Sequence, residues 1–244
     1  MNVLITGGTG GIGFAVAEHF GRLGHHVILA DINSSQLDSR QQELTAAGYQ
    51  ASSILLNLME QSSIEACAQA YQIDILINNA GTIMRAPAAE HPDEYWDRVL
   101  NINLDAQFIL AREIGKHMIE RGTGKIIFTC SLLSFQGGVN VPGYAASKGA
   151  LSSLVKALAN EWASKGVNVN GIAPGYIATD NTEALRNDPD RHAAILARIP
   201  AGHWGDPADL GGAAIFLASD AAAYVHGITL PVDGGFLASG ARGI

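Results

Sequence analysis

A glycine-rich turn stands between the first predicted strand and the first predicted helix of this chain. The turn reads Thr6-Gly7-Gly8-Thr9-Gly10-Gly11-Ile12-Gly13 and follows an apolar run. Glycines allow the backbone to approach a phosphate closely, and the amide groups at the following helix N-terminus favour its negative charge. A lone glycine motif is weak evidence, but this position between strand and helix predicts a dinucleotide-binding unit. The residues expected to bind the dinucleotide here are Gly7, Thr9, Gly10, Gly11, Ile12 and Gly13.

The rest of the chain alternates short apolar runs with longer amphipathic segments. The runs predict strands at 2–6, 27–30, 51–56, 75–78, 125–130, 167–172 and 228–232. The segments predict helices at 13–23, 35–47, 64–71, 93–121, 144–165 and 207–219. Several strands are almost wholly apolar, which is typical of parallel strands covered on both faces. We therefore predict an α/β fold, a doubly wound, mostly parallel Rossmann sheet with helices on both faces, formed by residues 1–244 as a single domain. Segment 176–204 fits this pattern least well and is predicted to be an insertion that covers the site.

Composition and charge restrict the possible functions. The 244 residues are enough for one large domain, and the formal net charge of −8 disfavours nucleic-acid binding, which depends on Lys and Arg. Cys67 and Cys130 have no metal-ligand spacing, so we expect reduced thiols and no metal site. No apolar run reaches the roughly 20 residues that cross a bilayer, and a strand-like run follows Met1 directly. We expect a cytoplasmic protein that has no secretory leader and does not bind membranes.

Asp31 ends the second predicted strand, 18 residues after Gly13 (31 − 13). A carboxylate at this place accepts hydrogen bonds from the adenosine ribose and repels a 2′-phosphate. The next residues, Ile32 and Asn33, provide no arginine for such a phosphate. We therefore predict NAD as the cofactor in preference to NADP, with a simple surface turn at Asp31 as the alternative.

Tyr144 and Lys148 stand four residues apart on a predicted helix, so their side chains share one face. Free tyrosine has a pKa of about 10, which is too high for an efficient base near neutrality. A nearby ammonium group favours the phenolate and lowers that pKa. Such a pair also occurs on solvated helices, so by itself it proves little.

Polar or turn-forming residues follow three of the predicted strands. Ser131 comes directly after the strand that ends at Cys130, Asn78-Asn79-Ala80-Gly81 ends the fourth strand, and Pro174-Gly175 follows the sixth. Open α/β sheets bind ligands at the carboxyl ends of their strands. These residues are therefore expected on the cofactor side of the sheet.

With these motifs in order, the chain resembles a classical short-chain dehydrogenase/reductase over essentially its whole length. The resemblance is carried by the glycine turn, Asn78-Asn79-Ala80-Gly81, Asn103, Ser131, Tyr144 with Lys148, and Pro174-Gly175. The interval of 13 residues between Ser131 and Tyr144 (144 − 131) is also that of the family. The family implies a nicotinamide-dependent oxidoreductase that interconverts an alcohol and a ketone.

The resemblance also implies roles for individual residues. Tyr144 would exchange a proton with the substrate oxygen, Ser131 would hydrogen-bond that oxygen, and Lys148 would hold the nicotinamide ribose and lower the pKa of Tyr144. Asn103 would anchor a water that relays the proton, with a purely structural, helix-kinking amide as the alternative. Further cofactor contacts are implied for Asp31, Ile32, Asn57, Leu58, Asn79, Ala80, Gly81, Tyr144, Lys148, Pro174, Gly175, Ile177 and Thr179. Asn57-Leu58 departs from many members, which have an aspartate there for the adenine amino group; an asparagine oxygen can accept the same bond.

The substrate must be inferred from other residues, because this fold serves many chemistries. Segments 131–138, 160–163, 173–182 and 198–205 are similar to one branch of the family, the bacterial sugar-acid dehydrogenases. A sugar acid needs a cation for its carboxylate, for which we predict Arg85, and hydrogen-bonding groups for its hydroxyls. Besides Ser131 and Tyr144, these groups are predicted to be Gln136, Tyr176, Asn181, His203 and Trp204. The alternatives are a solvated Arg85, and packing of the insertion for His203 and Trp204.

Two other functions remain open at this point. A general ketone reductase or 3-oxoacyl-carrier-protein reductase of the same family would share the catalytic residues, but most such enzymes would need NADPH. A nucleotide-sensing regulator without catalysis would be expected to have lost Ser131, Tyr144 or Lys148, and all three are present. The sequence leaves open which sugar acid and which carbon react, in which direction, and whether residues 236–244 reach a neighbouring subunit.

The expected partners are further copies of the chain. The resemblance implies a homotetramer with closed symmetry. Helices 93–121 and 144–165 also carry more apolar residues than one face would need, among them Phe108, Ile109, Leu151, Leu154, Val155 and Leu158. The alternative is that both helices are simply buried against the sheet.

Overall fold

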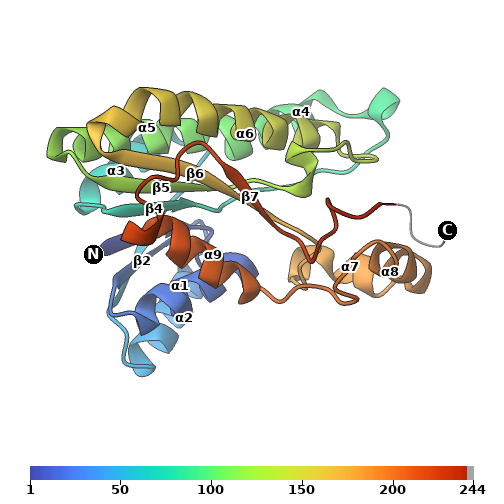
Figure 1. Cartoon of the computed structure of the whole chain (residues 1–244), viewed down its shortest axis with the longest axis horizontal. Helices are drawn as coiled ribbons and strands as arrows, with labels where there is room; N and C mark the ends of the chain where they lie inside the picture. Colours follow the sequence, from blue (N-terminus) through green and yellow to red (C-terminus); the bar gives the residue numbers. More distant parts are fainter. Residues whose placement is uncertain (241–244) are drawn as a thin grey trace.

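Seven parallel strands form one sheet through the centre of the molecule (Figure 1). The computed structural model describes residues 1–240. The strands are β1 (Asn2–Thr6), β2 (His26–Asp31), β3 (Ala51–Leu55), β4 (Ile75–Asn78), β5 (Gly124–Thr129), β6 (Val167–Pro174) and β7 (Thr229–Val232). Their order is β3-β2-β1-β4-β5-β6-β7, with every pairing parallel. The predicted parallel sheet is confirmed, and each predicted strand matches an observed one to within two residues at either end.

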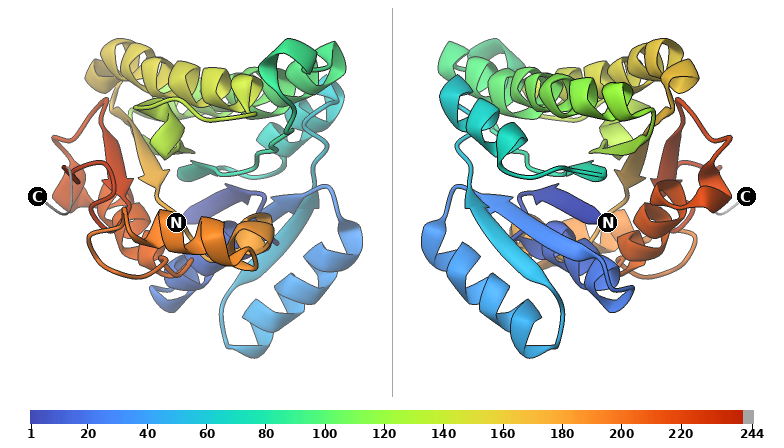
Figure 2. Two further views of the ribbon diagram at one scale, coloured as in Figure 1. Left: turned by 90° about the vertical axis from the view of Figure 1, so that its right-hand side faces the viewer. Right: turned by 90° about the vertical axis from the view of Figure 1, so that its left-hand side faces the viewer.

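Helices cover both faces of this sheet (Figure 2). On one face lie α1 (Gly11–Arg22), α2 (Ser34–Ala46) and α9 (Asp209–Ala218). On the other face lie α3 (Gln61–Ala70), α4 (Asp93–Leu100), α5 (Ala106–Arg121) and α6 (Pro142–Trp162). The doubly wound arrangement is therefore confirmed. No helix within residues 1–240 is long and apolar enough to span a membrane.

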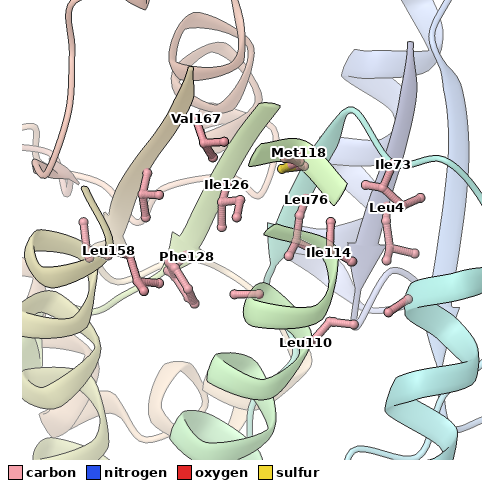
Figure 3. Packing of buried hydrophobic residues seen from close by; sticks show 14 of the residues in the cluster. Leu4, Ile73, Leu76, Leu110, Ile114, Met118, Ile126, Phe128, Leu158 and Val167 are labelled. Carbon is pink, nitrogen blue, oxygen red and sulfur yellow. The ribbon is translucent and has the colours of Figure 1, made fainter. Parts of the chain in front are cut away.

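Successive strand residues alternate between two hydrophobic cores, which explains why the strands are apolar throughout. Leu4 and Leu76 face the core under α3, α5 and α6, whereas Ile5 and Ile77 face the core under α1 and α9. Figure 3 shows the first core, where Phe128 of β5 lies near residues of α5 and α6. Of the apolar helix residues that suggested an oligomer interface, Leu151, Val155 and Leu158 belong to this core, and Ile109 and Leu154 pack against it. For these five residues, burial against the sheet is the observed explanation.

The predicted continuous helix 93–121 is wrong in one respect. A π-helical turn, Asn101–Asp105, separates α4 from α5. The side chain of Asn103 is fully buried in this turn and hydrogen-bonds the backbone of Thr82, on the loop after β4. Such π-helical turns frequently lie at functional sites, and hydrophobic periodicity cannot reveal one.

The segment 176–204 folds over the carboxyl end of the sheet. It contains two short helices, α7 (Glu183–Arg186) and α8 (Pro189–Leu196), which lie together at one end of the molecule (Figure 1). A small third cluster holds it in place, where Ile195 and Ile199 pack with Leu132 and Phe236. The segment is therefore attached to the turn that follows Ser131 and to the chain after β7.

Candidate active site

A cavity of about 820 Å³ lies at the carboxyl ends of the strands. Its walls come from the turns after β1, β2, β3, β4, β5 and β6, from α6 and from segment 176–204. This volume is within the range of small-molecule and cofactor sites, roughly 300–1,000 Å³. The predicted cofactor residues that line it are Gly7, Thr9, Gly10, Gly11, Ile12, Asp31, Ile32, Asn57, Leu58, Asn79, Ala80, Gly81, Tyr144, Lys148, Pro174, Gly175, Ile177 and Thr179. Gly13 alone among the predicted set does not line the cavity.

The glycine turn is packed against the loop after β4. Gly7 has a φ of +62°, and a Cβ atom on it would lie 2.9 Å from Cα of Ala80. A Cβ atom on Gly13 would collide with the carbonyl oxygen of Gly7. The Asn79 amide donates to the carbonyls of Thr6 and Gly7, at 3.1 and 3.3 Å. Gly13 therefore packs against the turn without lining the cavity. The turn fits the close backbone approach that a dinucleotide phosphate requires.

Asp31 lies at the cavity wall and is held by the glycine turn. Its Oδ2 accepts a hydrogen bond from Oγ1 of Thr9 at 2.6 Å, and its Oδ1 accepts one from the backbone N–H of Ile32 at 2.8 Å. A carboxylate has about four lone-pair sites, so Asp31 keeps acceptor capacity for a further donor. Asp31 is therefore a half-buried, oriented carboxylate and not a freely rotating surface group.

Ser131, Tyr144 and Lys148 meet at the same cavity from two different segments. Ser131 follows β5, and its hydroxyl faces the same cavity as Tyr144 on α6 and acts on Tyr144 in the direction that lowers its pKa. The Lys148 ammonium donates to the carbonyl of Thr129 at 2.6 Å and lies 5.6 Å from the centre of the Tyr144 ring. Burial lowers the pKa of Lys148 to about 8. The three predicted residues thus line the same cavity, where Tyr144 provides a titratable hydroxyl and Ser131 and Lys148 provide hydrogen-bond donors.

The expected depression of the Tyr144 pKa is not found in the chain alone. Burial raises the pKa of Tyr144, and the hydrogen bond from Ser131 opposes this rise. Cys130 raises the pKa further, whereas the positive charge of Arg85 lowers it. The prediction assigned the depression to Lys148 together with the oxidised nicotinamide. Within the protein the Lys148 ammonium group is directed to the Thr129 carbonyl, and desolvation outweighs the favourable contacts.

Asn103 does not line the cavity, although it lies next to it. Its Oδ1 accepts from the backbone N–H of Thr82 at 2.8 Å, and its Nδ2 donates to the Thr82 carbonyl at 2.8 Å and to Ser147 Oγ at 3.2 Å. Asn103 therefore joins the loop after β4 to α6. The water that it was expected to anchor stays a prediction.

The predicted substrate residues divide into two groups. Arg85 and Asn181 line the cavity together with Ser131 and Tyr144. Gln136, Tyr176, His203 and Trp204 are not among the lining residues. The rings of Tyr176 and Trp204 are 5.4 Å apart, and Tyr176 also packs on Phe236 at 5.2 Å, so these aromatic groups hold segment 176–204 in place.

Some lining residues were missed by the sequence analysis. Gln36 lies on the first turn of α2, beside Thr9 (Oγ1···Oε1 3.2 Å), and Thr182 lies on segment 176–204. The short distance in sequence from Asp31 to Gln36 could have indicated the first. Arg98 of α4 also lines the cavity, but no motif or spacing marks it.

Comparisons with known proteins agree with this geometry. A family model of the short-chain dehydrogenases, described as "Enoyl-(Acyl carrier protein) reductase", matches residues 7–237. A 2-dehydro-3-deoxy-D-gluconate 5-dehydrogenase from Pseudoalteromonas atlantica is 54% identical, over 96% of this chain and 94% of that protein. The chain belongs to the short-chain dehydrogenase/reductase family. It is therefore an oxidoreductase by family, as the motifs predicted.

Other members of the family are similar over nearly the whole chain. The enzyme of the same name from Bacillus subtilis is 48% identical, over 96% of this chain and 93% of that protein. A gluconate 5-dehydrogenase from Burkholderia cenocepacia, solved with NADP and tartrate, is 36% identical with a TM-score of 0.94 and covers 98% of this chain and 96% of its own. A protein from Beutenbergia cavernae, provisionally named an NAD(P)-dependent gluconate 5-dehydrogenase and also solved with NADP, is 46% identical with a TM-score of 0.95 and covers 98% and 97%.

The role of Gly13 in the turn leads to a prediction. Gly13→Ala places a methyl group against the Gly7 carbonyl and should distort the turn, so that NADH binds at least about tenfold more weakly while the protein stays folded. Titration of the protein with NADH, followed by fluorescence, measures the affinity. Gly212→Ala on α9 is the matched control, because nothing lies within 4 Å of a Cβ there. Equal affinity of both variants would contradict a role of this turn in binding.

Proposed function

We propose that the chain is an NAD(H)-dependent dehydrogenase that interconverts a secondary alcohol and a ketone on a sugar acid, with Tyr144 as the general acid/base. The observation that carries the proposal is the convergence of Ser131, Tyr144 and Lys148 on one cavity with Asp31 and Arg85. The names of similar proteins support the substrate class. They include 2-dehydro-3-deoxy-D-gluconate 5-dehydrogenase, 5-keto-D-gluconate 5-reductase and gluconate 5-dehydrogenase.

The cavity residues fit a nicotinamide dinucleotide. In the proposal, the glycine turn takes the diphosphate, the Asp31 carboxylate accepts from the adenosine ribose, and Lys148 donates to the nicotinamide ribose. Asn57, Leu58, Asn79, Ala80, Gly81, Pro174, Gly175, Ile177 and Thr179 line the same cavity, and the last four are proposed to lie at the nicotinamide end. When bound, the coenzyme supplies or accepts the hydride at the substrate carbon.

In the proposal, Tyr144 accepts or donates the proton. In alcohol oxidation its phenolate oxygen accepts the hydroxyl proton of the substrate, and in ketone reduction its hydroxyl returns a proton to the carbonyl oxygen. Ser131 donates a hydrogen bond to the same substrate oxygen and so stabilises the charge that develops there. Because burial raises the pKa of Tyr144, oxidation should become faster as the pH rises toward that pKa, and reduction should be favoured at lower pH.

Arg85 is proposed to bind the substrate carboxylate. It lines the cavity, makes no ion pair within residues 1–240, and lies close enough to Tyr144 for its charge to lower the Tyr144 pKa. A guanidinium group can hold a carboxylate through two parallel hydrogen bonds. Asn181, which also lines the cavity, is proposed to contact the hydroxyl groups.

The function can be tested on a panel of substrates with NADH and NADPH in separate assays. The panel holds keto-deoxy sugar acids, 2-deoxy-D-gluconate with NAD, an acetoacetyl thioester and a steroid ketone. Turnover of the sugar acids is expected, and Tyr144→Phe should lower kcat by at least about a hundredfold because the acid/base group is lost. Activity confined to the thioester with NADPH would contradict both the substrate class and the cofactor.

The choice between NAD and NADP depends on Asp31 in this proposal. Ile32, Asn33 and Gln36 place no positive charge beside it, whereas three of the similar solved structures carry NADP. Asp31→Asn should lower kcat/KM for NAD about ten- to a hundredfold and reduce the preference over NADP, because a charge-assisted hydrogen bond to the ribose is lost. Asp38→Asn, an exposed change on α2, is the control. A wild-type protein that prefers NADP, or an unchanged ratio in Asp31→Asn, would show that Asp31 does not select the cofactor.

We also propose that the chain assembles as a homotetramer in the cytoplasm. Large apolar side chains remain exposed on α5 and α9, with Phe108 36% and Phe216 41% exposed. Light scattering after size exclusion should give four times the mass of the chain, and Phe108→Glu should reduce it. A monomeric wild-type protein would exclude the assembly.

A further inference from the structure

Ser134 is a half-buried serine that does not line the cavity and has no role in the function proposed above. It ends the short 3-10 turn Leu132–Ser134, directly after Ser131. Its hydroxyl donates to the carbonyl of Lys148 at 2.7 Å, and its oxygen accepts from the backbone N–H of Ser131 at 3.3 Å. One hydroxyl group thus connects the two segments that carry the catalytic trio, the turn after β5 and helix α6.

The position of this turn decides where the Ser131 hydroxyl points. Ser131 Oγ accepts the backbone N–H of Leu133 at 3.1 Å, which uses one of its lone pairs. The Ser131 proton is therefore free to be donated toward the Tyr144 oxygen. The influence of Ser131 opposes the burial-driven rise of the Tyr144 pKa more strongly than any other group.

Few other hydrogen bonds hold the turn against α6. The Ser134–Lys148 bond is the one hydrogen bond between residues 131–134 and α6 in the described part of the chain. Leu132 packs instead with Ile199 and Phe236, which fastens the turn to segment 176–204. A hydrogen bond fixes both direction and distance, whereas apolar packing alone allows small shifts.

We propose that Ser134 is a positioning residue, which holds the turn against α6 at the distance where the Ser131 hydroxyl donates to Tyr144. The inference rests on the proposed role of Tyr144 as general acid/base. The other titratable or charged groups that face Tyr144 are Cys130 after β5, Lys148 on α6 and Arg85 after β4. None of them forms a hydrogen bond to the Tyr144 side chain in residues 1–240, so none can replace the donor that Ser131 provides.

Ser134→Ala tests this inference through the pH dependence of alcohol oxidation. We expect kcat to fall about tenfold, because a small displacement of a catalytic group has a large effect on rate, while KM for the dinucleotide stays the same. The midpoint of the rise of kcat/KM for the alcohol with pH, which reports the enzyme before the alcohol binds, should move to higher pH, because weaker donation from Ser131 favours the protonated form of Tyr144. Ser134→Thr keeps the hydroxyl and should restore both values.

Ser219→Ala is the matched control. Ser219 is also half-buried and donates to a backbone carbonyl, that of Phe216 at 2.8 Å, at the end of α9 away from the cavity. It should lose comparable stability in thermal unfolding and keep the wild-type pH midpoint. If Ser134→Ala does not fold, Ser134→Cys, which retains a weaker donor, takes its place, and an intermediate shift is expected.

A second readout needs neither substrate nor cofactor. The difference in tyrosinate absorbance between each protein and its Tyr144→Phe counterpart reports the ionisation of Tyr144 directly, and it should move to higher pH in Ser134→Ala. If this shift is seen but no sugar acid is turned over, the proposed substrate is wrong and the positioning role stands. If Ser134→Ala titrates and turns over like the wild type, or Ser134→Thr is as impaired as Ser134→Ala, the positioning role is wrong.

Discussion

The pairing of β1 with both β2 and β4 is the constraint on which the rest of the structure depends. The chain runs outward from β1 to β2 and β3, and then crosses to the other side of β1 to begin β4. Connections therefore leave the carboxyl ends of β1 and β4 toward opposite faces, and a crevice opens between them. The buried Thr6 hydroxyl accepts the backbone N–H groups of Asn79 and Ala80, both at 3.0 Å, and ties the two strand ends together. The glycine turn and the loop after β4 are thus walls of one cavity.

The two halves of the site differ in their burial. At the proposed dinucleotide half, Asp31 is held by hydrogen bonds and stays partly open to solvent. At the chemical half, burial raises the pKa of Tyr144 and lowers that of Lys148, which moves both groups away from their charged forms. The Ser131 hydrogen bond and the positive charge of Arg85 act in the other direction on Tyr144. The reactivity of Tyr144 therefore depends on a few polar contacts whose geometry the surrounding turns must maintain.

The hydrogen bonds of Asn103 and Ser134 show how that geometry is maintained. Asn103 reaches from the π-helical turn to Thr82 and to Ser147 on α6, and Ser134 reaches from the turn after β5 to the Lys148 carbonyl. Both side chains hold α6 to a neighbouring segment, at Ser147 and at Lys148. The aromatic contacts of Tyr176 and Trp204 have a comparable effect in segment 176–204, where they orient the cavity wall without lining it.

The sequence by itself determined the elements and the chemistry that they carry. Apolar strands of four to eight residues, separated by helical segments, leave a two-sided parallel sheet as the favourable way to bury them. Local pattern marked the glycine turn, Ser131 and the Tyr144–Lys148 pair, and the resemblance to the family implied their roles. Only the tertiary structure decided which of the remaining polar residues reach the cavity. Arg85 and Asn181 line it, and Gln136, Tyr176, His203 and Trp204 do not. Gln36, Arg98 and Thr182 also line it, although the sequence analysis did not select them. The physical reason is that the strand and helix periods are local properties, whereas the direction of a loop side chain depends on packing between segments far apart in the chain, such as Leu132, Ile199 and Phe236.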